Sequence, residues 1–163
     1  MRYLVLLLVL AYLAACSGNS SIKNGLEGKP IPAFSILLPD SITYFNIANV
    51  PPGKPMVLFY LSPQCPYCRA QLKDIIEDMN KLKEVQFYLV SSFPVSEIRR
   101  FSSEYKLDQY PNIVIGKDTS DVVANYFEAI YVPYTAIFGK DGKLKKTFEG
   151  KIYSRQIRSV IGD

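Results

Sequence analysis

MVLFYLSPQCPYC, residues 56–68, is the stretch of this chain that decides the fold. It opens with a short continuous apolar run, which is the pattern of a strand buried on both faces of a sheet. Apolar side chains then recur at helical spacing at Leu72, Ile75, Ile76, Met79 and Leu82. Cys65 and Cys68 therefore lie at the junction between a buried strand and a helix.

This placement favours reactive cysteines. Cys65 lies at the expected start of the helix, where unpaired backbone N–H groups and the positive end of the helix dipole favour a thiolate. Pro66 suits the first helical position, because the N–H that it lacks would have no partner there. Cys68 follows about one turn later, close enough to form a disulfide with Cys65.

The rest of the chain alternates between strand and helix patterns. We expect strands at 33–38, 42–47 and 56–61, a helix at 66–83, a strand at 85–91, a helix at 96–105, a strand at 112–115 and a helix at 119–130. Strands at 134–138 and 143–148 flank the turn GKDG at 139–142, and a helix at 153–161 ends the series. The predicted fold class is α/β, with a central mixed sheet flanked by helices and an N-terminal β-hairpin extension.

The third cysteine, Cys16, follows a segment that reads as a leader. Residues 1–15 contain one positive charge at Arg2, a leucine-rich apolar run and two alanines. The apolar run is shorter than the roughly 20 residues that cross a bilayer, and it has the form of a signal peptide. The sequence LAAC at 13–16 resembles the bacterial lipobox, which implies that Cys16 is lipidated and begins the mature chain. An ordinary signal or an uncleaved anchor with an incidental cysteine is the alternative.

The domain organisation follows from this leader. We expect a signal peptide at 1–15, a flexible tether at 16–30 and a single folded domain at 31–163, because the residues after Cys16 are small and polar. Without Arg2 the chain has 18 basic and 15 acidic residues. These charges form no basic stripe, so we expect no nucleic-acid partner. The cluster Lys143, Lys145 and Lys146 is interpreted as the solvated face of a strand.

The chain contains no histidine. This excludes a Ser-His-Asp triad, a Cys-His nucleophile pair and an HExxH zinc helix. A structural zinc ion takes four ligands, and two cysteines alone do not supply them. We therefore expect no metal site and no cofactor other than a redox-active disulfide.

On these residues the chain resembles the thioredoxin superfamily, and within it the TlpA- and ResA-like thiol-disulfide oxidoreductases of bacterial envelopes. The resemblance covers about residues 29–162. GKPMVLFY at 53–60 is similar to the family's lead-in and central strand, and VPYTAIF at 132–138 is similar to the segment that carries its cis-proline. The sequence DGK at 141–143 matches the family's hairpin, and Gly150 matches the glycine before its last helix.

The resemblance implies roles for particular residues. Cys65 would be the attacking cysteine and Cys68 the resolving one. Pro133 would be the cis-proline, and Val132 would present its backbone to the substrate; a trans-proline that opens an edge strand is the alternative.

The aromatic residues divide between the core and the site. Tyr67 and Tyr134 are expected to border the substrate groove. Other aromatic residues are expected in the core: Phe87, Tyr88, Phe101, Phe127 and Phe138.

The chain departs from the family at three points near the cysteines. Phe59 stands where many thioredoxins carry a buried acid that assists proton transfer, and Gln64 replaces a common tryptophan. The dipeptide between the cysteines, Pro66-Tyr67, is the one associated with glutaredoxins. Arg69 and Lys73 follow on the helix. A solvated helical face is the favoured interpretation of both, and electrostatic stabilisation of a thiolate is the alternative.

The expected function is that of an envelope thiol-disulfide oxidoreductase, acting as a reductase. Its expected partners are client proteins with disulfides or thiols, a membrane electron donor or acceptor, and the lipid bilayer through Cys16. We expect a lipid-anchored monomer that faces the periplasm.

Two other functions stay open. A peroxiredoxin-like enzyme would require proline at position 58 and threonine at 62, where the chain has Leu58 and Ser62. A non-catalytic binding module would use the two cysteines as a structural disulfide.

Overall fold

The computed structural model describes residues 21, 23–49, 51 and 53–162. The predicted signal peptide and Cys16 lie outside these residues. Seven strands are described: β1 (Ser35–Leu37), β2 (Tyr44–Asn46), β3 (Met56–Tyr60), β4 (Gln86–Ser91), β5 (Ile113–Asp118), β6 (Tyr134–Phe138) and β7 (Leu144–Glu149). The described helices are α2 (Pro66–Glu77), α3 (Met79–Leu82), α4 (Val95–Glu104), α5 (Val122–Phe127) and α6 (Ser154–Gly162), with a 3₁₀ turn at Leu107–Gln109.

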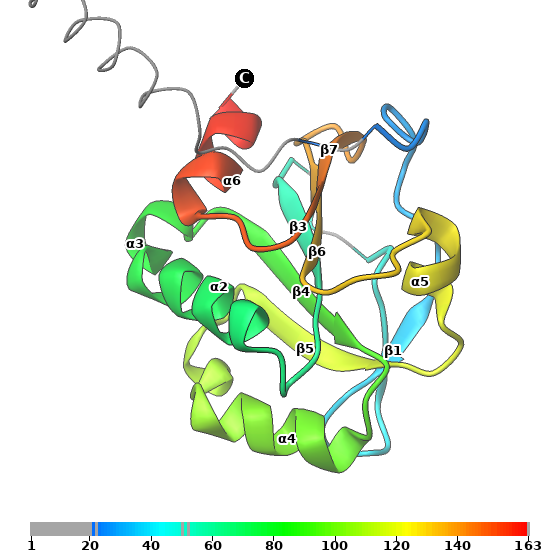
Figure 1. The fold of residues 1–163 in the computed structure, drawn as a ribbon, viewed down its shortest axis with the longest axis vertical. Helices are drawn as coiled ribbons and strands as arrows, with labels where there is room; N and C mark the ends of the chain where they lie inside the picture. The colour runs from blue at the N-terminus through cyan, green and yellow to red at the C-terminus, as the bar shows by residue number, and fades with distance from the viewer. Residues whose placement is uncertain (1–20, 22, 50, 52, 163) are drawn as a thin grey trace, which may run out of the picture.

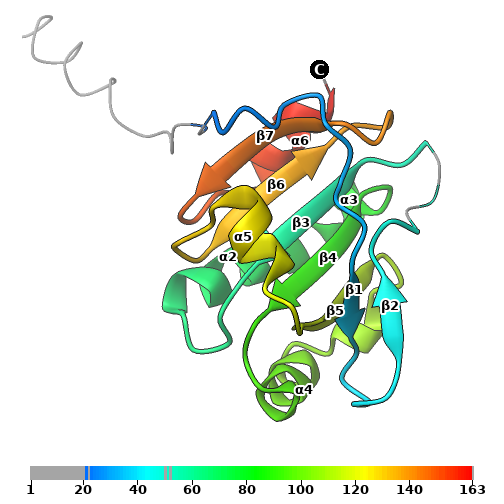
Figure 2. The ribbon, with the colours of Figure 1, turned by 90° about the vertical axis from the view of Figure 1, so that its right-hand side faces the viewer.

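The strands form one mixed sheet in the order β2-β1-β5-β4-β3-β6-β7 (Figure 1). Strands β3, β4 and β5 are parallel, whereas β1, β2, β6 and β7 pair antiparallel with their neighbours. Helix α5 lies on one face of the sheet and α2 on the other (Figure 2). The predicted fold class is confirmed, including the N-terminal hairpin of β1 and β2.

The sheet has an apolar core on each face because its central strands are apolar throughout. Along β3, Val57 and Phe59 join the core beneath α2, α4 and α6, while Met56, Leu58 and Tyr60 join the core beneath α5. Strands β3 and β4 are buried along their full length. The five aromatic residues that were predicted in the core are all buried.

The predicted helix at 66–83 is divided in two. Asp78 leaves helical geometry, with φ −99° and ψ 12°, and ends α2. Its carboxylate accepts hydrogen bonds from the Ser154 hydroxyl and from Lys81, both at 2.7 Å. Because Ser154 begins α6, the residue at the break is bonded to a segment that is far away in the sequence.

Other boundaries also differ from the prediction. Helix α5 ends at Phe127 rather than near 130, because Glu128 takes a left-handed conformation with φ 53°. Strand β5 continues to Asp118, where β1 pairs with it. The Asp118 carboxylate accepts a hydrogen bond from the backbone N–H of Val123 at 2.8 Å, which joins the end of β5 to α5.

The end of the predicted tether is attached to the folded domain. The Gly28 N–H donates to the Leu144 carbonyl, and the Leu144 N–H donates to the Lys29 carbonyl, each at 2.9 Å. Pro30 forms an isolated bridge with Lys143. Residues 28–30 therefore lie against the start of β7.

A buried glutamine connects α2 to two other segments. Gln71 is fully buried. Its side-chain amide donates to the Thr135 hydroxyl on β6 at 2.8 Å and accepts from the Ile152 N–H at 2.9 Å. This residue fixes the helix that carries the cysteines against β6 and the segment before α6.

Replacing Gln71 by leucine should lower the free energy of unfolding by about 2 kcal/mol, because a buried N–H at Ile152 and a buried hydroxyl at Thr135 lose their partners. Urea denaturation measures the change. Lys73→Leu, an exposed change on the same helix, should stay within about 0.5 kcal/mol of wild type. Equal stabilities of the two variants would show that the Gln71 contacts are not stabilising.

Candidate active site around Cys65 and Cys68

Cys65 occupies the N-cap of α2, as predicted. Its sulfur accepts a hydrogen bond from the Cys68 N–H at 3.4 Å, and Pro66 begins the helix. The Cys65 thiol also lies 3.8 Å from the Val132 carbonyl, to which it can donate. Cys65 is half-buried and packs at the edge of the core that holds Cys68. Both cysteines are free thiols in this structure.

Cys68 lies inside the protein. It is fully buried and packs in the same apolar core as Phe59 and Leu72. Burial raises the pKa of the Cys68 thiol to about 12, because a charged sulfur would lose its hydration in this core. The two thiols therefore differ: one is accessible at a helix start, and the other is held neutral beneath it.

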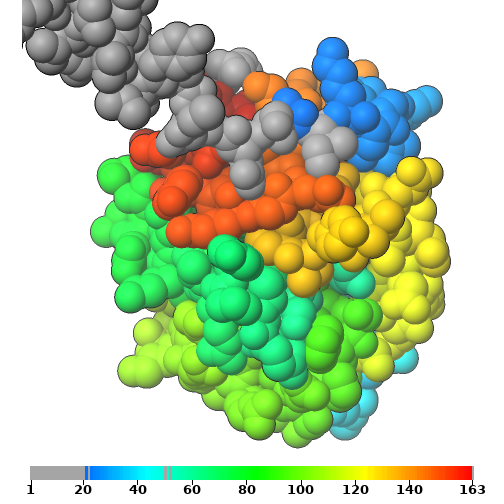
Figure 3. Space-filling model, viewed as in Figure 1, coloured from blue at the N-terminus to red at the C-terminus, as the bar shows by residue number. Residues whose placement is uncertain are grey.

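The segment before β6 forms the opposite wall of the site. The Val132-Pro133 peptide bond is cis, as the resemblance implied, and the alternative of a trans-proline is excluded. Val132 is partly buried and directs its carbonyl at Cys65. Figure 3 shows the first turn of α2, in teal and green, meeting the yellow-orange segment that precedes β6 on the face toward the viewer.

An exposed apolar rim, formed by Tyr67, Ile130 and Tyr131, belongs to the two segments that carry the cysteines and the cis-proline. Tyr67 is 65% exposed, Ile130 79% and Tyr131 68%. Ile130 and Tyr131 were missed by the sequence analysis, because the helix was predicted to continue to about 130. Two large apolar residues directly before an X-Pro bond are the signal that could have identified them.

The prediction that Tyr134 borders the substrate groove is wrong. Tyr134 is only 2% exposed and packs against Phe127 of α5, with ring centroids 5.8 Å apart. Successive residues of a strand point to opposite faces of the sheet. Tyr134 therefore faces α5, and its neighbour Thr135 reaches Gln71 on α2.

Arg69 is not simply part of a solvated face, as the sequence analysis had favoured, because its side chain makes specific contacts. Its Nε donates to the Pro63 carbonyl at 2.7 Å, and its guanidinium pairs with Glu104 of α4. The guanidinium also lies over the Phe101 ring, 5.5 Å from the centroid. Arg69 thus ties the loop before Cys65 to α4. Lys73 is exposed and lies 3.9 Å from Glu77, consistent with a solvated face.

The family departures have clear structural settings. Phe59 is fully buried in the core that holds Cys68, so the place of the acid is apolar. Gln64 is exposed; its side-chain amide contacts Glu97 of α4, and its carbonyl accepts from the Ser62 hydroxyl at 3.0 Å.

The described part of the chain contains no cluster of three His, Cys, Asp or Glu side chains that could hold a metal ion. Within the same residues, no helix combines the length and apolarity needed to cross a membrane.

Alkylation should separate the two thiols. At pH 7 we expect iodoacetamide to modify Cys65 at least about 100-fold faster than Cys68, because Cys68 is buried and almost entirely protonated. Peptide mass spectrometry of the reduced protein after timed quenching measures both rates. In urea the rates should converge. Similar rates in the folded protein would contradict the assignment of Cys68 as the buried thiol.

Comparison with known proteins identifies a family and a fold. The AhpC/TSA family model matches residues 28–147. The methylamine utilization protein MauD of Methylophilus methylotrophus is 27% identical over 128 residues, which are 78% of this chain and 58% of MauD. The chain thus spans less than two thirds of this relative's length.

Two solved structures share the fold. A secreted disulfide oxidoreductase of Mycobacterium tuberculosis aligns with a TM-score of 0.65 at 20% identity, covering 79% of this chain and 94% of that one. An exposed lipoprotein thioredoxin of Streptococcus pneumoniae aligns with a TM-score of 0.61 at 23% identity, covering 78% and 96%. Both confirm the thioredoxin-like fold.

Proposed function

The chain belongs to the AhpC/TSA family, within the thioredoxin superfamily, and from this premise we propose that it is a thiol-disulfide oxidoreductase that reduces disulfides in client proteins. One observation carries the proposal. A partly exposed Cys65 stands at a helix start, while a buried Cys68 lies directly beneath it, with its N–H 3.4 Å from the Cys65 sulfur.

The reaction takes place in two exchanges. The Cys65 thiolate attacks one sulfur of the client disulfide, the client S–S bond breaks, and the second client sulfur leaves and takes up a proton. Cys68 then loses its proton and attacks Cys65, which breaks the mixed disulfide and releases the second client thiol. Two electrons pass to the client, and the Cys65–Cys68 pair becomes a disulfide. A membrane electron donor would reduce that pair again.

Comparing insulin with hydrogen peroxide as the oxidant of the reduced protein distinguishes a disulfide reductase from a peroxidase. Peroxiredoxins carry proline and threonine where this chain has Leu58 and Ser62, and Leu58 is buried within β3. The reduced protein is mixed with insulin or with hydrogen peroxide, and loss of the two thiols is followed by mass spectrometry. We expect insulin to oxidise the pair and peroxide to react no faster than with free cysteine. Faster oxidation by peroxide would overturn the proposal.

The reducing direction has its own test. Equilibration with glutathione buffers gives the potential of the Cys65–Cys68 couple. A value at or below about −220 mV supports a reductase, whereas a value near −120 mV is that of a disulfide-forming protein.

We also propose that Cys16 carries a lipid anchor that holds the domain in the bacterial cell envelope. The LAAC sequence at 13–16 supports this proposal. A lipoprotein thioredoxin among the structures with the same fold is consistent with it.

The apolar rim should serve client proteins more than small disulfides. Replacing both Ile130 and Tyr131 by serine should slow insulin reduction about five- to tenfold, because apolar contact area with the client is lost. Reaction with a small aromatic disulfide should be unchanged. Ile42→Ser, at an equally exposed residue beside β2, is the matched control. An unchanged insulin rate in the double variant would remove the rim from the client site.

A further inference from the structure

Positive charge is unevenly distributed along the chain. Residues 21–30 and 139–162 together carry nine basic and three acidic side chains. Residues 31–138 carry nine basic and eleven acidic side chains. The excess of positive charge therefore belongs to the N-terminal segment and to the unit of β7 and α6.

These two segments lie side by side in the fold. The backbone of residues 28–30 is hydrogen-bonded or bridged to Lys143 and Leu144. Strand β7 is an edge of the sheet, and Lys143, Lys145 and Lys146 are exposed along it. This edge thus carries the exposed side chains of Lys140, Lys143, Lys145 and Lys146 beside Lys29, whereas Arg158 of α6 is paired with Asp78 at 3.4 Å. Lys145 is paired with Asp141 at 2.9 Å.

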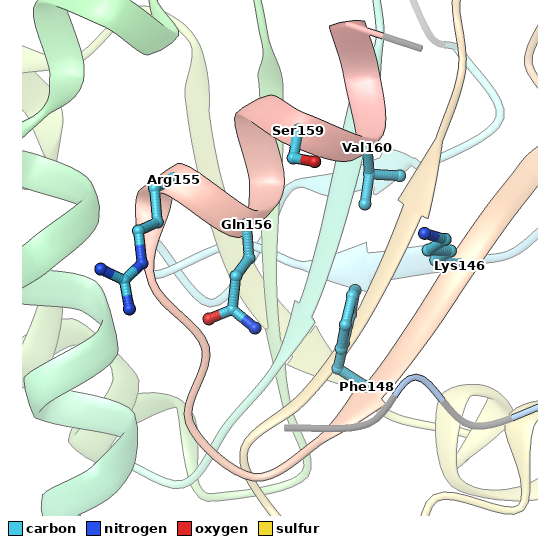
Figure 4. Close-up of a pocket in the computed structure, with 6 residues that line it drawn as sticks. All are labelled: Lys146, Phe148, Arg155, Gln156, Ser159 and Val160. Carbon is cyan, nitrogen blue, oxygen red and sulfur yellow. The ribbon is translucent and has the colours of Figure 1, made fainter. Parts of the chain in front are cut away.

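A surface hollow of about 400 Å³ lies between β7 and α6 (Figure 4). Phe148 and Val160 supply its apolar lining, and Lys146 and Ser159 stand on opposite sides of it (Figure 4). Arg155 and Gln156 complete the lining. A hollow with an apolar base and a cationic rim suits a group that is both anionic and apolar, such as the headgroup region of an acidic phospholipid.

The chain length places this edge near the proposed anchor. Eleven residues separate Cys16 from Gly28, where the backbone is already attached to β7. Even fully extended, they span about 40 Å. A lipid on Cys16 would therefore keep the β7 edge within about 40 Å of the bilayer.

The dithiol lies away from the start of β7, where Lys143 is found, although the far end of β7 approaches it, because the Gly150 N–H donates to the Pro133 carbonyl at 2.8 Å. Strand β6 separates β7 from β3, and Cys65 follows the carboxyl end of β3. The turn that holds Lys143 joins β6 to β7 beside the opposite end of β3, where Met56 pairs with Phe138. A bilayer at the Lys143 end of the β7 edge would leave Cys65 accessible.

We propose that the basic face formed by β7 and α6 docks on anionic phospholipid headgroups and orients Cys65 away from the membrane. The proposal rests on the proposed lipid anchor at Cys16, but it does not depend on the redox activity.

Lysine acetylation of the full-length lipidated protein tests the orientation. The protein is reconstituted in vesicles of phosphatidylcholine alone or mixed with phosphatidylglycerol and is treated with an amine-reactive acetylating reagent. Peptide mass spectrometry then measures the acetylation of each lysine. We expect acetylation of Lys143 and Lys146 to become several-fold slower with the anionic lipid and to recover in high salt. Lys81 and Lys83, on and next to α3, should not change.

Two outcomes overturn the proposal. One is equal acetylation of Lys143 and Lys146 in the two kinds of vesicle. The other is protection that is already complete in detergent without lipid, which would show that the chain itself covers the face.

Vesicle flotation separates this proposal from the anchor. Cys16→Ala should lose flotation with neutral vesicles but keep salt-sensitive flotation with anionic ones. Adding Lys143→Glu and Lys146→Glu to Cys16→Ala should weaken that remaining binding at least about tenfold, whereas adding Lys81→Glu and Lys83→Glu should not. If the wild-type protein does not float with neutral vesicles, the lipid anchor is contradicted and the basic face is not. If the two triple variants float equally well with anionic vesicles, the basic face is contradicted and the anchor is not.

Discussion

Replacing Cys68 by serine should convert the protein into a covalent trap. Cys65 remains partly exposed at the start of α2 and still attacks client disulfides, but no second thiol lies beneath it to release the client. Turnover should fall at least about 1,000-fold, and mixed disulfides between Cys65 and its clients, which a reductant cleaves, should accumulate. Electrophoresis with and without reductant, after expression in the native envelope, measures both effects and identifies the clients.

Cys65→Ser is the matched control, because it removes the attacking sulfur and leaves Cys68 buried. Neither turnover nor adducts should remain. If Cys65→Ser also forms adducts, the order of the two cysteines is wrong. If Cys68→Ser reduces insulin at the wild-type rate, the two-cysteine mechanism fails.

Alkaline pH should destabilise the reduced protein through Cys68. The pKa of this thiol is about 12 in the folded protein, whereas an unfolded cysteine titrates near 8.5. Above about pH 8.5 the unfolded chain releases this proton and the folded protein keeps it, so stability falls as pH rises until the folded pKa is passed. Between pH 7 and pH 10 the loss due to Cys68 should be about 2 kcal/mol.

Urea denaturation with reductant at several pH values measures this loss. Cys68→Ala should have a flatter pH dependence over the same range, whatever its absolute stability. The comparison ends at pH 10 because burial also raises the pKa of Tyr88 and of Tyr134, which adds a slope of the same sign at higher pH. Identical slopes for wild type and Cys68→Ala would contradict the raised pKa.

The sequence predicts those features that depend on neighbouring residues. The continuous apolar run of β3 specifies a strand buried on both faces, and Pro66 after Cys65 specifies a helix start. The cis bond at Pro133 was anticipated from the family resemblance rather than from local pattern. These elements account for the fold class and for the position of both thiols.

Contacts between distant segments account for the errors. Asp78, which ends α2, is bonded through its carboxylate to Ser154, 76 residues away. Tyr134 was misplaced because alternation shows which residues of β6 share a face, but not which face carries α2. The rim residues Ile130 and Tyr131 became visible only once α5 was seen to end at Phe127.

The burial of Cys68 has a consequence for how the reduced protein stores its electrons. Because burial raises the pKa of Cys68 to about 12, this thiol is protonated at pH 7. Stray oxidants and electrophiles that react with thiolates therefore encounter Cys65 first, and Cys68 stays in reserve beneath it. Such reagents therefore oxidise or modify the Cys65 sulfur, and the Cys68 sulfur stays reduced. The order in which the two sulfurs react is in this way a property of the fold.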